Sequence, residues 1–214
     1  MDTAALEKNI DIGADVVGAG GKKLGKVAYV VVKPPEMHLT DIVVDTGLIL
    51  GREVVVPVGL IREVEGGKVQ LSIDKDELEV YPDYIEVNYQ VPPPNWVPPV
   101  DSTYPPAAVL LPATATVPEL ETVRINAPPG TSGIRDGMEV YTSDDQKVGS
   151  VDAVDVDLAT DEITGFVVKH GFLFTRDTRI PAKDVREIGD GKVILRLSKA
   201  QVEQVEREQR EHLN

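Results

Sequence analysis

The sequence contains no cysteine, only three histidines and few aromatic residues. The absence of cysteine excludes disulfide bonds, iron–sulfur clusters, thiolate zinc sites and cysteine nucleophiles. Aromatic residues make up 5% of the chain and hydrophobic residues 42%, which predicts a core built from aliphatic side chains. Basic residues are also scarce, because 22 Lys and Arg stand against 36 Asp and Glu, a formal net charge of −14. Since nucleic-acid binding depends on Lys and Arg contacts to phosphates, we expect no nucleic-acid partner.

Long hydrophobic runs are missing as well. The longest are of strand length, such as residues 27–32, and none approaches the roughly 18 apolar residues of a membrane helix. Residues 1–8 lack the basic start and the apolar stretch of a signal peptide. We therefore expect a cytoplasmic protein with no membrane span of its own, which leaves docking to a membrane protein open.

An internal repeat organises the sequence. Residues 13–78 align without a gap with residues 137–202, at a constant offset of 124 positions, and 20 of the 66 aligned pairs are identical. The identities fall on glycines, on a proline and on an Arg–Glu pair, which chance matches would not favour. They include Gly13 with Gly137, Gly25 with Gly149, Gly47 with Gly171, Pro57 with Pro181, and Arg62-Glu63 with Arg186-Glu187. The chain therefore contains a duplication.

The segment between the two copies has a different composition. Eleven of the 16 prolines lie in residues 91–130. Because proline lacks a backbone donor and fixes φ, we expect neither a helix nor a central strand there. We predict an extended, polyproline-like strap that is partly docked, with a flexible spacer or a Pro-rich ligand for an aromatic groove as alternatives. The predicted organisation is a first domain at 10–90, a Pro-rich linker at 91–130 and a second domain at 131–214.

Each copy shows short β-branched runs separated by turn residues at intervals of roughly ten, which is typical of a small antiparallel barrel or sandwich. In the first copy we expect strands at residues 15–17, 26–33, 39–45, 53–57, 61–65 and 68–72. In the second copy we expect them at residues 139–141, 150–158, 162–170, 177–180, 185–189 and 192–197. Each copy then closes with a capping residue, Asp74 or Ser198, followed three positions later by Glu or Gln. The first helix must end before Pro82, and the second is predicted to run from about residue 199 to residue 213.

Four motifs recur in the same order in both copies. In the first they are Leu24-Gly25-Lys26-Val27, Val43-Val44-Asp45-Thr46-Gly47, Val56-Pro57 and Leu71-Ser72-Ile73. In the second they are Val148-Gly149-Ser150-Val151, Val167-Val168-Lys169-His170-Gly171, Ile180-Pro181 and Leu195-Arg196-Leu197. Their order resembles the PRC-barrel family, whose barrel is found in the H subunit of photosynthetic reaction centres and in the ribosome maturation factor. The resemblance covers about 140 of the 214 residues.

The resemblance implies an all-β protein with two small PRC-barrel-like antiparallel β-barrels, each closed by a short α-helix and joined by the Pro-rich linker. It also implies an adaptor or self-association module without a catalytic residue set. The membrane helix that precedes the reaction-centre barrel and the RNA-facing domain that precedes the ribosomal one have no counterpart in this sequence. The resemblance therefore bears on the fold and the general role rather than on either of these two tasks.

Three sequence patterns suggest chemistry, and each has a simpler interpretation. Residues 18–23 are glycine-rich but satisfy neither GxxxxGK[ST] nor GxGxxG, so we interpret them as a hairpin turn. The histidines His38, His170 and His212 have no partners at the spacing of a catalytic triad or a metal site. Arg52-Glu53 and Arg62-Glu63 are neighbours on strands and point to opposite faces, which indicates structural salt links.

An acidic group in the second copy is the strongest candidate for ion binding. It comprises Asp144, Asp145, Asp152, Asp155, Asp157, Asp161 and Glu162. It lacks the D-x-D-x-D-G order of a calcium loop, so we interpret it as a solvated strand face and turn. Weak divalent binding around Asp155, Asp157 and Asp161 is the alternative. We predict no catalytic residue, no metal and no cofactor.

Two loops carry apolar residues where a loop tip is normally polar. They are Leu48-Ile49-Leu50 and, at the equivalent position, Phe172-Leu173-Phe174. Such residues need cover from the other barrel, from the strap or from a second chain, unless they fold inward. Together with Trp96 they form the predicted interface, and we expect the barrels to pair within the chain or the chain to form a homodimer.

The sequence thus predicts a non-catalytic scaffold for protein–protein interaction or assembly, with a protein partner that the sequence does not name. The alternative is an acidic peripheral accessory subunit of a photosynthetic or respiratory membrane complex, which tunes ion or proton access.

Overall fold

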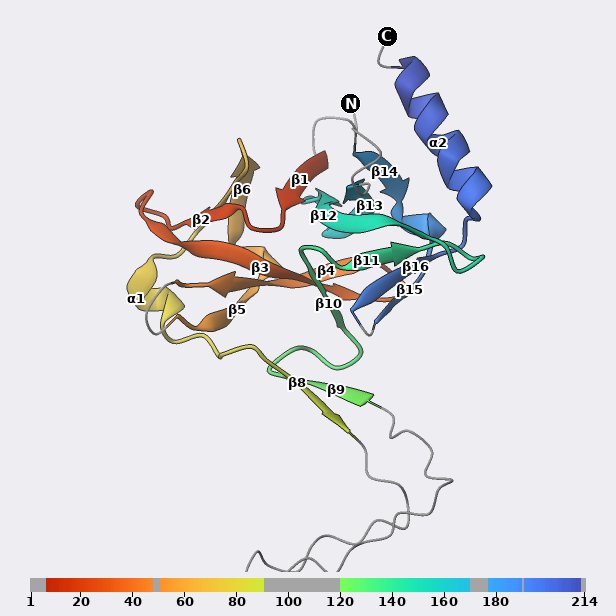
Figure 1. Ribbon diagram of the computed structural model, residues 1–214. Coiled ribbons are helices and arrows are strands. Elements are labelled where there is room, and N and C mark those ends of the chain that lie inside the picture. Colours follow the sequence, from red (N-terminus) through yellow and green to blue (C-terminus); the bar gives the residue numbers. More distant parts are fainter. Residues whose placement is uncertain (1–6, 48–50, 91–119, 170–176, 190, 213–214) are drawn as a thin grey trace, which may run out of the picture. The chain divides into compact units, whose positions relative to one another are not determined.

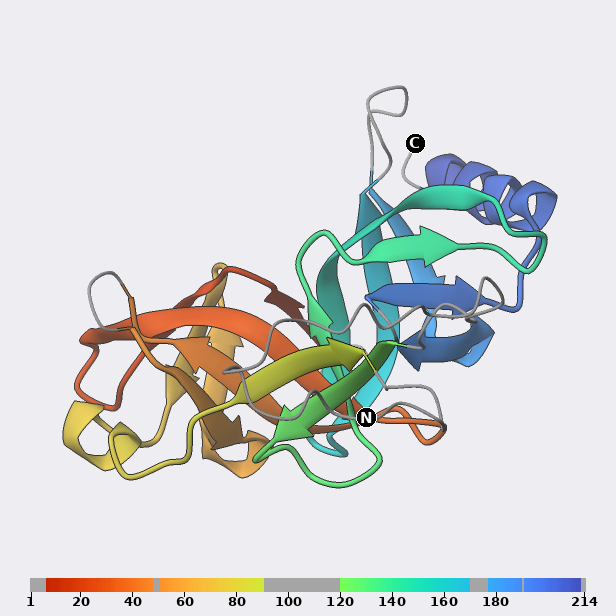
Figure 2. The ribbon, with the colours of Figure 1, turned by 60° about the horizontal axis from the view of Figure 1, so that its bottom comes forward.

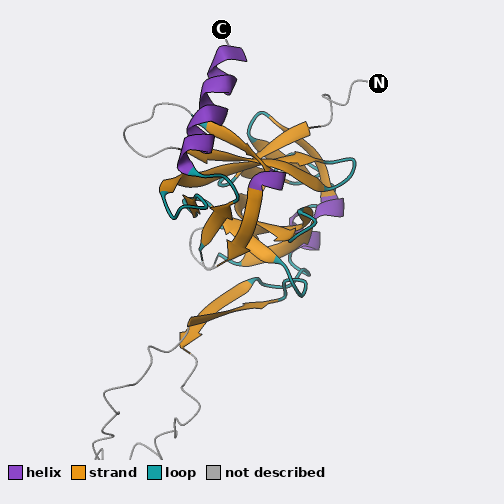
Figure 3. Cartoon of the chain, turned by 90° about the vertical axis from the view of Figure 1, so that its right-hand side faces the viewer, coloured by secondary structure: helices purple, strands orange, loops and turns teal. Residues whose placement is uncertain are grey.

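The protein is described from a computed structural model, which covers residues 7–47, 51–90, 120–169, 177–189 and 191–212. These residues are mostly β-strand, with two α-helices (Figure 3). The chain divides into a larger unit, Met1–Tyr84 with Asn126–Asn214, and a smaller unit, Ile85–Ile125. Both repeats thus belong to one compact unit.

The first repeat supplies seven strands and a short helix to the larger unit (Figure 1). They are β1 (Glu7–Asp11), β2 (Asp15–Val17), β3 (Lys23–Lys33), β4 (His38–Asp45), β5 (Glu53–Pro57), β6 (Ile61–Glu65), β7 (Lys68–Leu71) and α1 (Lys75–Leu78). The single turn η2 (Val58–Leu60) joins β5 to β6.

The second repeat supplies the same series, with a longer helix at its end. Its elements are β10 (Ser132–Arg135), β11 (Glu139–Tyr141), β12 (Lys147–Asp157), β13 (Glu162–Lys169), β14 (Thr178–Pro181), η3 (Ala182–Asp184), β15 (Val185–Gly189), β16 (Lys192–Leu195) and α2 (Lys199–His212). Each strand lies 124 residues after its counterpart, to within one residue at either end. The described strands of the two repeats form one 14-stranded sheet. Figure 2 shows the strands of the first repeat in red and orange and most strands of the second repeat in teal and blue.

The two repeats exchange their first strands. β1 of the first repeat runs antiparallel to β12 of the second, with Ile10 opposite Val154. β10 of the second repeat runs antiparallel to β3 of the first, with Ile134 opposite Val30. Both isoleucines are fully buried. Each repeat is therefore completed by a strand that belongs, in sequence, to the other.

A glycine marks each point where the chain passes from the exchanged strand back to its own repeat. Gly13 has a φ of 97° and Gly137 a φ of 72°, in the left-handed region that favours glycine. The amide of Gly13 donates to the carbonyl of Val27 at 2.7 Å, and that of Gly137 to the carbonyl of Val151 at 3.1 Å. The geometry of the strand exchange thus accounts for the identity of these two residues in the repeat.

The repeats are related by an approximate two-fold axis. β4 and β13 pair antiparallel at His38 and Glu162, which are equivalent positions of the two copies. The hydrogen bonds on either side are reciprocal and both 2.8 Å long, from the amide of Leu39 to the carbonyl of Asp161 and from the amide of Ile163 to the carbonyl of Met37. Because equivalent residues of the two repeats pair with each other here, the approximate two-fold axis passes close to His38 and Glu162.

The core is aliphatic, as the composition predicts. A single cluster of buried side chains extends through both repeats and consists mainly of Val, Ile and Leu, with Phe166 as its one fully buried aromatic residue in the described chain. A valine-rich chain suits pleated strands because β-branched side chains pack well on both sheet faces. The shared core makes the two repeats parts of one folded body.

All twelve predicted strands occur, but the four remaining strands were not predicted. β3 and β12 each begin three residues earlier than expected, at Lys23 and Lys147. The exchanged strands β1 and β10 escape prediction because each is short and has a single buried isoleucine in place of a β-branched run. Both capping boxes are confirmed: the amide of Asp74 donates to Glu77 at 3.0 Å, and that of Ser198 to Gln201 at 2.8 Å.

The smaller unit is a two-stranded antiparallel hairpin of β8 (Ile85–Gln90) and β9 (Leu120–Ile125). β9 lies inside the Pro-rich segment, for which we expected neither a helix nor a central strand, and it is one strand of a two-stranded hairpin rather than a central strand. A strand can form there because residues 120–125 contain no proline, although Pro118 precedes them. Residues 91–119, which hold most of the predicted strap, lie outside the described chain.

Candidate functional site

The strand exchange creates two equivalent outward-facing surfaces, one beside each exchanged strand. The first outer face is formed by Tyr29, Val31, Asp41, Val43, Val55, Tyr84 and Gly133. The second outer face is formed by Asn9, Asp155, Gly165, Val167 and Arg179. Each face contains one residue from the other repeat, Gly133 or Asn9. The two faces therefore exist only in the exchanged arrangement.

The first outer face is apolar and covered. Val31, Val43, Val55 and Tyr84 form a second buried cluster, separate from the main core. The rings of Tyr29 and Tyr84 pack with their centroids 4.9 Å apart, within the range of favourable aromatic pairs. Tyr84 thus closes a valine surface that would otherwise be exposed.

Tyr84 is delivered by an extended segment that follows α1 and pairs with the outer edge of β5. The amide of Val55 donates to the carbonyl of Pro82 at 2.9 Å, and the amide of Tyr84 donates to the carbonyl of Glu53 at 2.6 Å. Residues Val54 and Asp83 form an antiparallel bridge between these bonds. The segment Pro82–Tyr84 therefore behaves as an added strand on this edge.

Arg52 fixes the same segment from the side. Its Nε donates to Asp83 Oδ1 at 2.5 Å, and its two terminal nitrogens donate to the carbonyls of Glu79 and Tyr81, each at 3.1 Å. A guanidinium group has several donors in one plane, so it can bind several carbonyl and carboxylate oxygens of one turn at the same time. The arginine has the structural role that the sequence indicates for it.

On the first outer face, Asp41 is a buried polar side chain that lacks part of its hydrogen bonding. It is 7% exposed, and its Oδ2 has no hydrogen-bond partner. Burial raises the pKa of this carboxyl group, while the neighbouring Thr40 hydroxyl acts in the opposite direction. Across β3 and β4 the residue lies opposite Val31.

The second outer face also has a carboxylate at this place, but the carboxylate belongs to β12, the counterpart of β3, rather than to the counterpart of β4. Asp155 occupies the position equivalent to Val31 and lies opposite Gly165, the counterpart of Asp41. It is 6% exposed. Its oxygens accept hydrogen bonds from Asn9 Nδ2 at 3.0 Å and from Arg179 Nε at 3.1 Å. The second repeat therefore pairs its buried carboxylate with a cation and an amide.

The difference between the faces follows from the counterparts of those two partners. In the first repeat Arg179 is replaced by Val55 and Asn9 by Gly133. A Cβ atom added to Gly133 would lie 2.8 Å from the Tyr84 hydroxyl oxygen, so Tyr84 fills the space where Asn9 lies in the second repeat. One duplicated surface has thus become apolar and covered on one side, and polar and ion-paired on the other.

Helix α2 packs against β14 beside the second outer face. The Thr178 hydroxyl donates to the buried carboxylate of Glu206 at 3.2 Å. The side-chain amide of Gln209 makes two hydrogen bonds to the backbone of Arg179. The α2 helix therefore covers the edge that the segment Pro82–Tyr84 covers in the first repeat.

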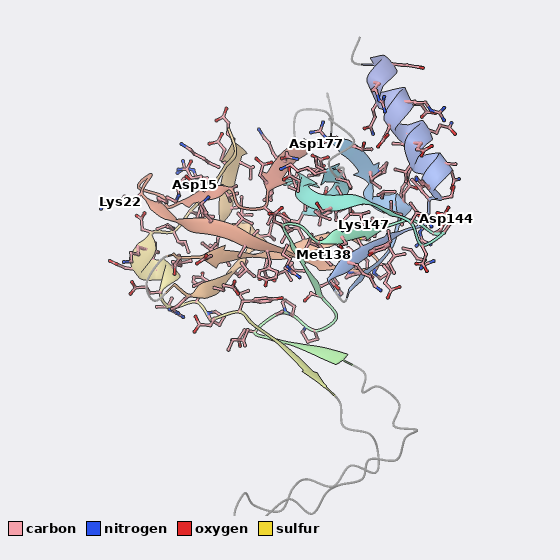
Figure 4. All side chains as sticks on the ribbon, viewed as in Figure 1. Asp15, Lys22, Met138, Asp144, Lys147 and Asp177 are labelled. Carbon is pink, nitrogen blue, oxygen red and sulfur yellow. The ribbon has the colours of Figure 1, made fainter. Side chains whose placement is uncertain are left out.

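The acidic residues of the second repeat have separate structural tasks. Asp144, which is labelled in Figure 4, accepts a hydrogen bond from the backbone amide of Lys199 at the start of α2, and the Thr142 hydroxyl lowers its pKa. Asp152 forms an ion pair with Lys169. Asp157 accepts the amide of Ala159 at 2.8 Å. Among the residues that the structure describes, no group of three His, Asp or Glu side chains is placed to hold a metal ion.

The glycine-rich turn also has a structural task. The amide of Gly20 donates to the Asp74 carboxylate at 3.0 Å, and the amide of Ala19 to the carbonyl of Ile73 at 3.0 Å. In the second repeat the acid has moved to the turn, as Asp144, and accepts from the helix instead. Turn and helix start are thus linked in both repeats, with the carboxylate on opposite sides.

The predicted interface residues Leu48, Ile49, Leu50, Phe172, Leu173, Phe174 and Trp96 lie outside the described chain. The residues of the two outer faces were not singled out from the sequence. One signal was present, because Asp41 directly precedes the apolar run Ile42-Val43-Val44 of β4. Tyr84 and Asn9 gave none, since each acts on a strand that is distant in sequence.

Comparison with protein families shows to which family the chain belongs. The sequence model of the PRC-barrel domain matches residues 12–78 and again residues 136–202. The chain belongs to the PRC-barrel family. It is a tandem PRC-barrel protein, and the two matches are offset by the same 124 residues as the repeat. Among curated proteins, none matches the chain.

The limits of the two PRC-barrel matches add a structural point. Each match begins directly after an exchanged strand, since β1 ends at Asp11 and β10 ends at Arg135. The strands that fuse the two PRC-barrel domains thus lie outside the matched domains. Most of α2 also lies beyond the second match. No helix in the described part of the chain is long and apolar enough to cross a membrane.

Proposed function

We propose that this tandem PRC-barrel protein is a non-catalytic scaffold that binds other proteins and acts in their assembly. The reciprocal exchange of β1 and β10 carries the proposal. It joins two PRC-barrel domains into one body with a shared core. A protein that holds two related domains in a fixed relation is suited to bring two partners together.

We further propose that each PRC-barrel domain closes as a barrel whose wall includes the strand received from the other. β1 supports this, because it is hydrogen-bonded to β12 while it lies next to β6 and β7 of its own repeat. β10 stands in the same relation to β3 and β15. Barrel closure of this kind protects sheet edges from unspecific pairing.

The loops between β4 and β5 and between β13 and β14 carry the proposed partner contacts. Each holds three apolar residues, Leu48-Ile49-Leu50 or Phe172-Leu173-Phe174. The sequence thus places an apolar cluster between two strands in each copy, and apolar clusters that are not covered mark interaction sites. We place the protein in the cytoplasm, where a cysteine-free acidic scaffold needs neither disulfides nor a cofactor.

Affinity purification of the tagged full-length chain tests the proposal. The variant with Leu48, Leu50, Phe172 and Phe174 all changed to Ser is expected to lose the partner that the wild-type chain captures. The matched control is Val80→Ser, which removes an apolar side chain that is 81% exposed at another place. Capture that is equal for all three proteins would contradict the loop interface, and a wild-type chain that captures no protein would contradict the scaffold function.

A further inference from the structure

The two repeats cover the same sheet edge in different ways. In the first repeat the outer edge of β5 is occupied by an extended segment of the chain. Its hydrogen bonds run from the amide of Val55 to the carbonyl of Pro82 and from the amide of Tyr84 to the carbonyl of Glu53. The first repeat thus shows that this edge accepts a further strand.

In the second repeat a single side chain stands where that strand would be. Arg179 of β14 is the counterpart of Val55, and its amide donates to Gln209 Oε1 at 3.1 Å. Gln209 Nε2 in turn donates to the carbonyl of Arg179 at 2.7 Å. A primary amide offers one donor and one acceptor, as a peptide group does. The side chain of Gln209 therefore makes the two hydrogen bonds to Arg179 that the backbone of one residue in a paired strand would make.

The part of α2 that carries Gln209 is held mainly by polar contacts. Val202 is the apolar anchor of the helix and is 2% exposed, whereas Val205 is only half-buried. Beyond them the contacts come from Glu206, which accepts from Thr178 and from Arg210. A helix end without further apolar burial is separated from its sheet at low cost, because helical stability comes mostly from packing.

We propose that the outer edge of β14 is a docking site for an extended peptide of a partner protein, and that Gln209 of α2 covers this edge in the free protein. The proposal deepens the scaffold function and rests on it. The first repeat supplies the occupant, since an extended segment lies on the equivalent edge there. Recognition by strand addition uses the main chain for affinity and side-chain positions for specificity.

The neighbouring side chains indicate which peptide fits. In the first repeat the segment places Tyr84 on Val55, whose counterpart Arg179 has a side chain that is 66% exposed. The planar guanidinium group of an arginine can stack on an aromatic ring. The edge of β14 therefore suits a peptide that places an aromatic residue on Arg179, as the segment Pro82-Asp83-Tyr84 places Tyr84 on Val55.

The test uses the full-length chain and a fluorescein-labelled peptide that copies residues 79–85, Glu-Val-Tyr-Pro-Asp-Tyr-Ile. Gln209→Ala removes the cover and is expected to bind the peptide about fivefold more tightly than the wild-type chain in an anisotropy titration. The same variant is expected to show about fivefold faster hydrogen exchange at the Arg179 amide. The matched control is Gln204→Ala, whose side-chain amide donates to Glu208 on the exposed side of the helix, and it is expected to behave as wild type.

A second pair of variants locates the bound peptide. In the Gln209→Ala background, Arg179→Pro removes the outward amide of β14, which an edge strand tolerates, and is expected to abolish binding. Arg179→Ala in the same background keeps the amide and is expected to retain the peptide. The proposal is overturned if Gln209→Ala and Gln204→Ala bind alike, if the Arg179 amide exchanges at the wild-type rate in Gln209→Ala, or if the Arg179→Pro variant still binds. In each of these cases capture of a partner by the wild-type chain would leave the scaffold function standing.

Discussion

At the scale of residues, Asp41 and Asp155 lie at the same place on the two outer faces. Asp41 belongs to β4, whereas Asp155 belongs to β12, which is the counterpart of β3. Asp155 is paired with Arg179 and Asn9, and Asp41 has an oxygen without a partner. A buried, unpartnered polar atom costs about 1–3 kcal/mol. Removal of the two carboxylates is therefore expected to have opposite effects on stability.

We expect Asp41→Val to raise the free energy of unfolding by about 1–2 kcal/mol, because valine matches the apolar face and removes the unpartnered oxygen. Asp155→Val is expected to lower it, since it leaves the Asn9 amide without its acceptor. Urea denaturation of both variants and the wild type measures the difference. A loss of stability in Asp41→Val would show that the carboxylate has a favourable role in the fold.

The raised pKa of Asp41 predicts a dependence of stability on pH. Between the unfolded value of 3.8 and the higher folded value, the native state binds more protons than the unfolded state, so stability falls as the pH rises. Relative to Asp41→Asn, which does not titrate, the wild type is expected to gain stability as the pH falls from 7 through the folded pKa. Below the unfolded value the difference becomes constant. Unfolding curves at several pH values measure it, and a difference that does not change with pH would refute the assignment.

Two glycines of the repeat are required by close approach of the backbone. A Cβ atom on Gly25 would lie 2.1 Å from the carbonyl oxygen of Asp45, and one on Gly149 would lie 2.3 Å from that of Lys169. Gly25→Ala and Gly149→Ala are each expected to destabilise the protein by about 2–3 kcal/mol, because backbone must move. Gly59→Ala is the control, since nothing lies within 4 Å of its Cβ position. Equal melting temperatures for all three variants would contradict this account.

At the scale of elements, α2 begins with a complete capping box. The amide of Ser198 donates to Gln201 Oε1 at 2.8 Å, and the amide of Gln201 donates to the Ser198 hydroxyl at 3.4 Å. Ser198→Ala is expected to lower the free energy of unfolding by about 1 kcal/mol and to reduce helical signal in circular dichroism. Ser198→Asp keeps an acceptor at the cap and is expected to retain wild-type stability. If both variants lose stability equally, the cap is not the cause.

The elements also show what can be predicted from a sequence of this kind. Strands β2 to β7 and their counterparts follow from alternation, turn residues and the repeat, and the two helices follow from their capping boxes. β1 and β10 do not follow, because residues such as Asn9 or Gly133 gain meaning only from partners more than a hundred positions away. The same holds for the outer faces, since the role of Tyr84 depends on a valine surface assembled from three strands and on β10. Local pattern predicts elements, whereas the choice of partner strand depends on tertiary packing.

At the scale of the whole molecule, the exchange makes each PRC-barrel domain depend on the other. A domain on its own would keep the strand that it normally donates and would lack the one that it receives. The buried isoleucines Ile10 and Ile134 would then lose their places, each worth about 1.5–3 kcal/mol of burial. The shared core predicts a single cooperative unfolding transition for the intact chain.

This dependence is tested by a split protein, made as two chains of residues 1–105 and 106–214. Co-expressed, the halves are expected to copurify as a one-to-one complex with the circular dichroism of the intact chain, because β1–β12 and β10–β3 pairing holds them together. Expressed alone, neither half is expected to be a folded monomer. Ile10→Asp in the first half and Ile134→Asp in the second each place a charge in a fully buried position and are expected to abolish copurification. Two halves that purify as separate folded monomers would show that each PRC-barrel domain keeps its own first strand.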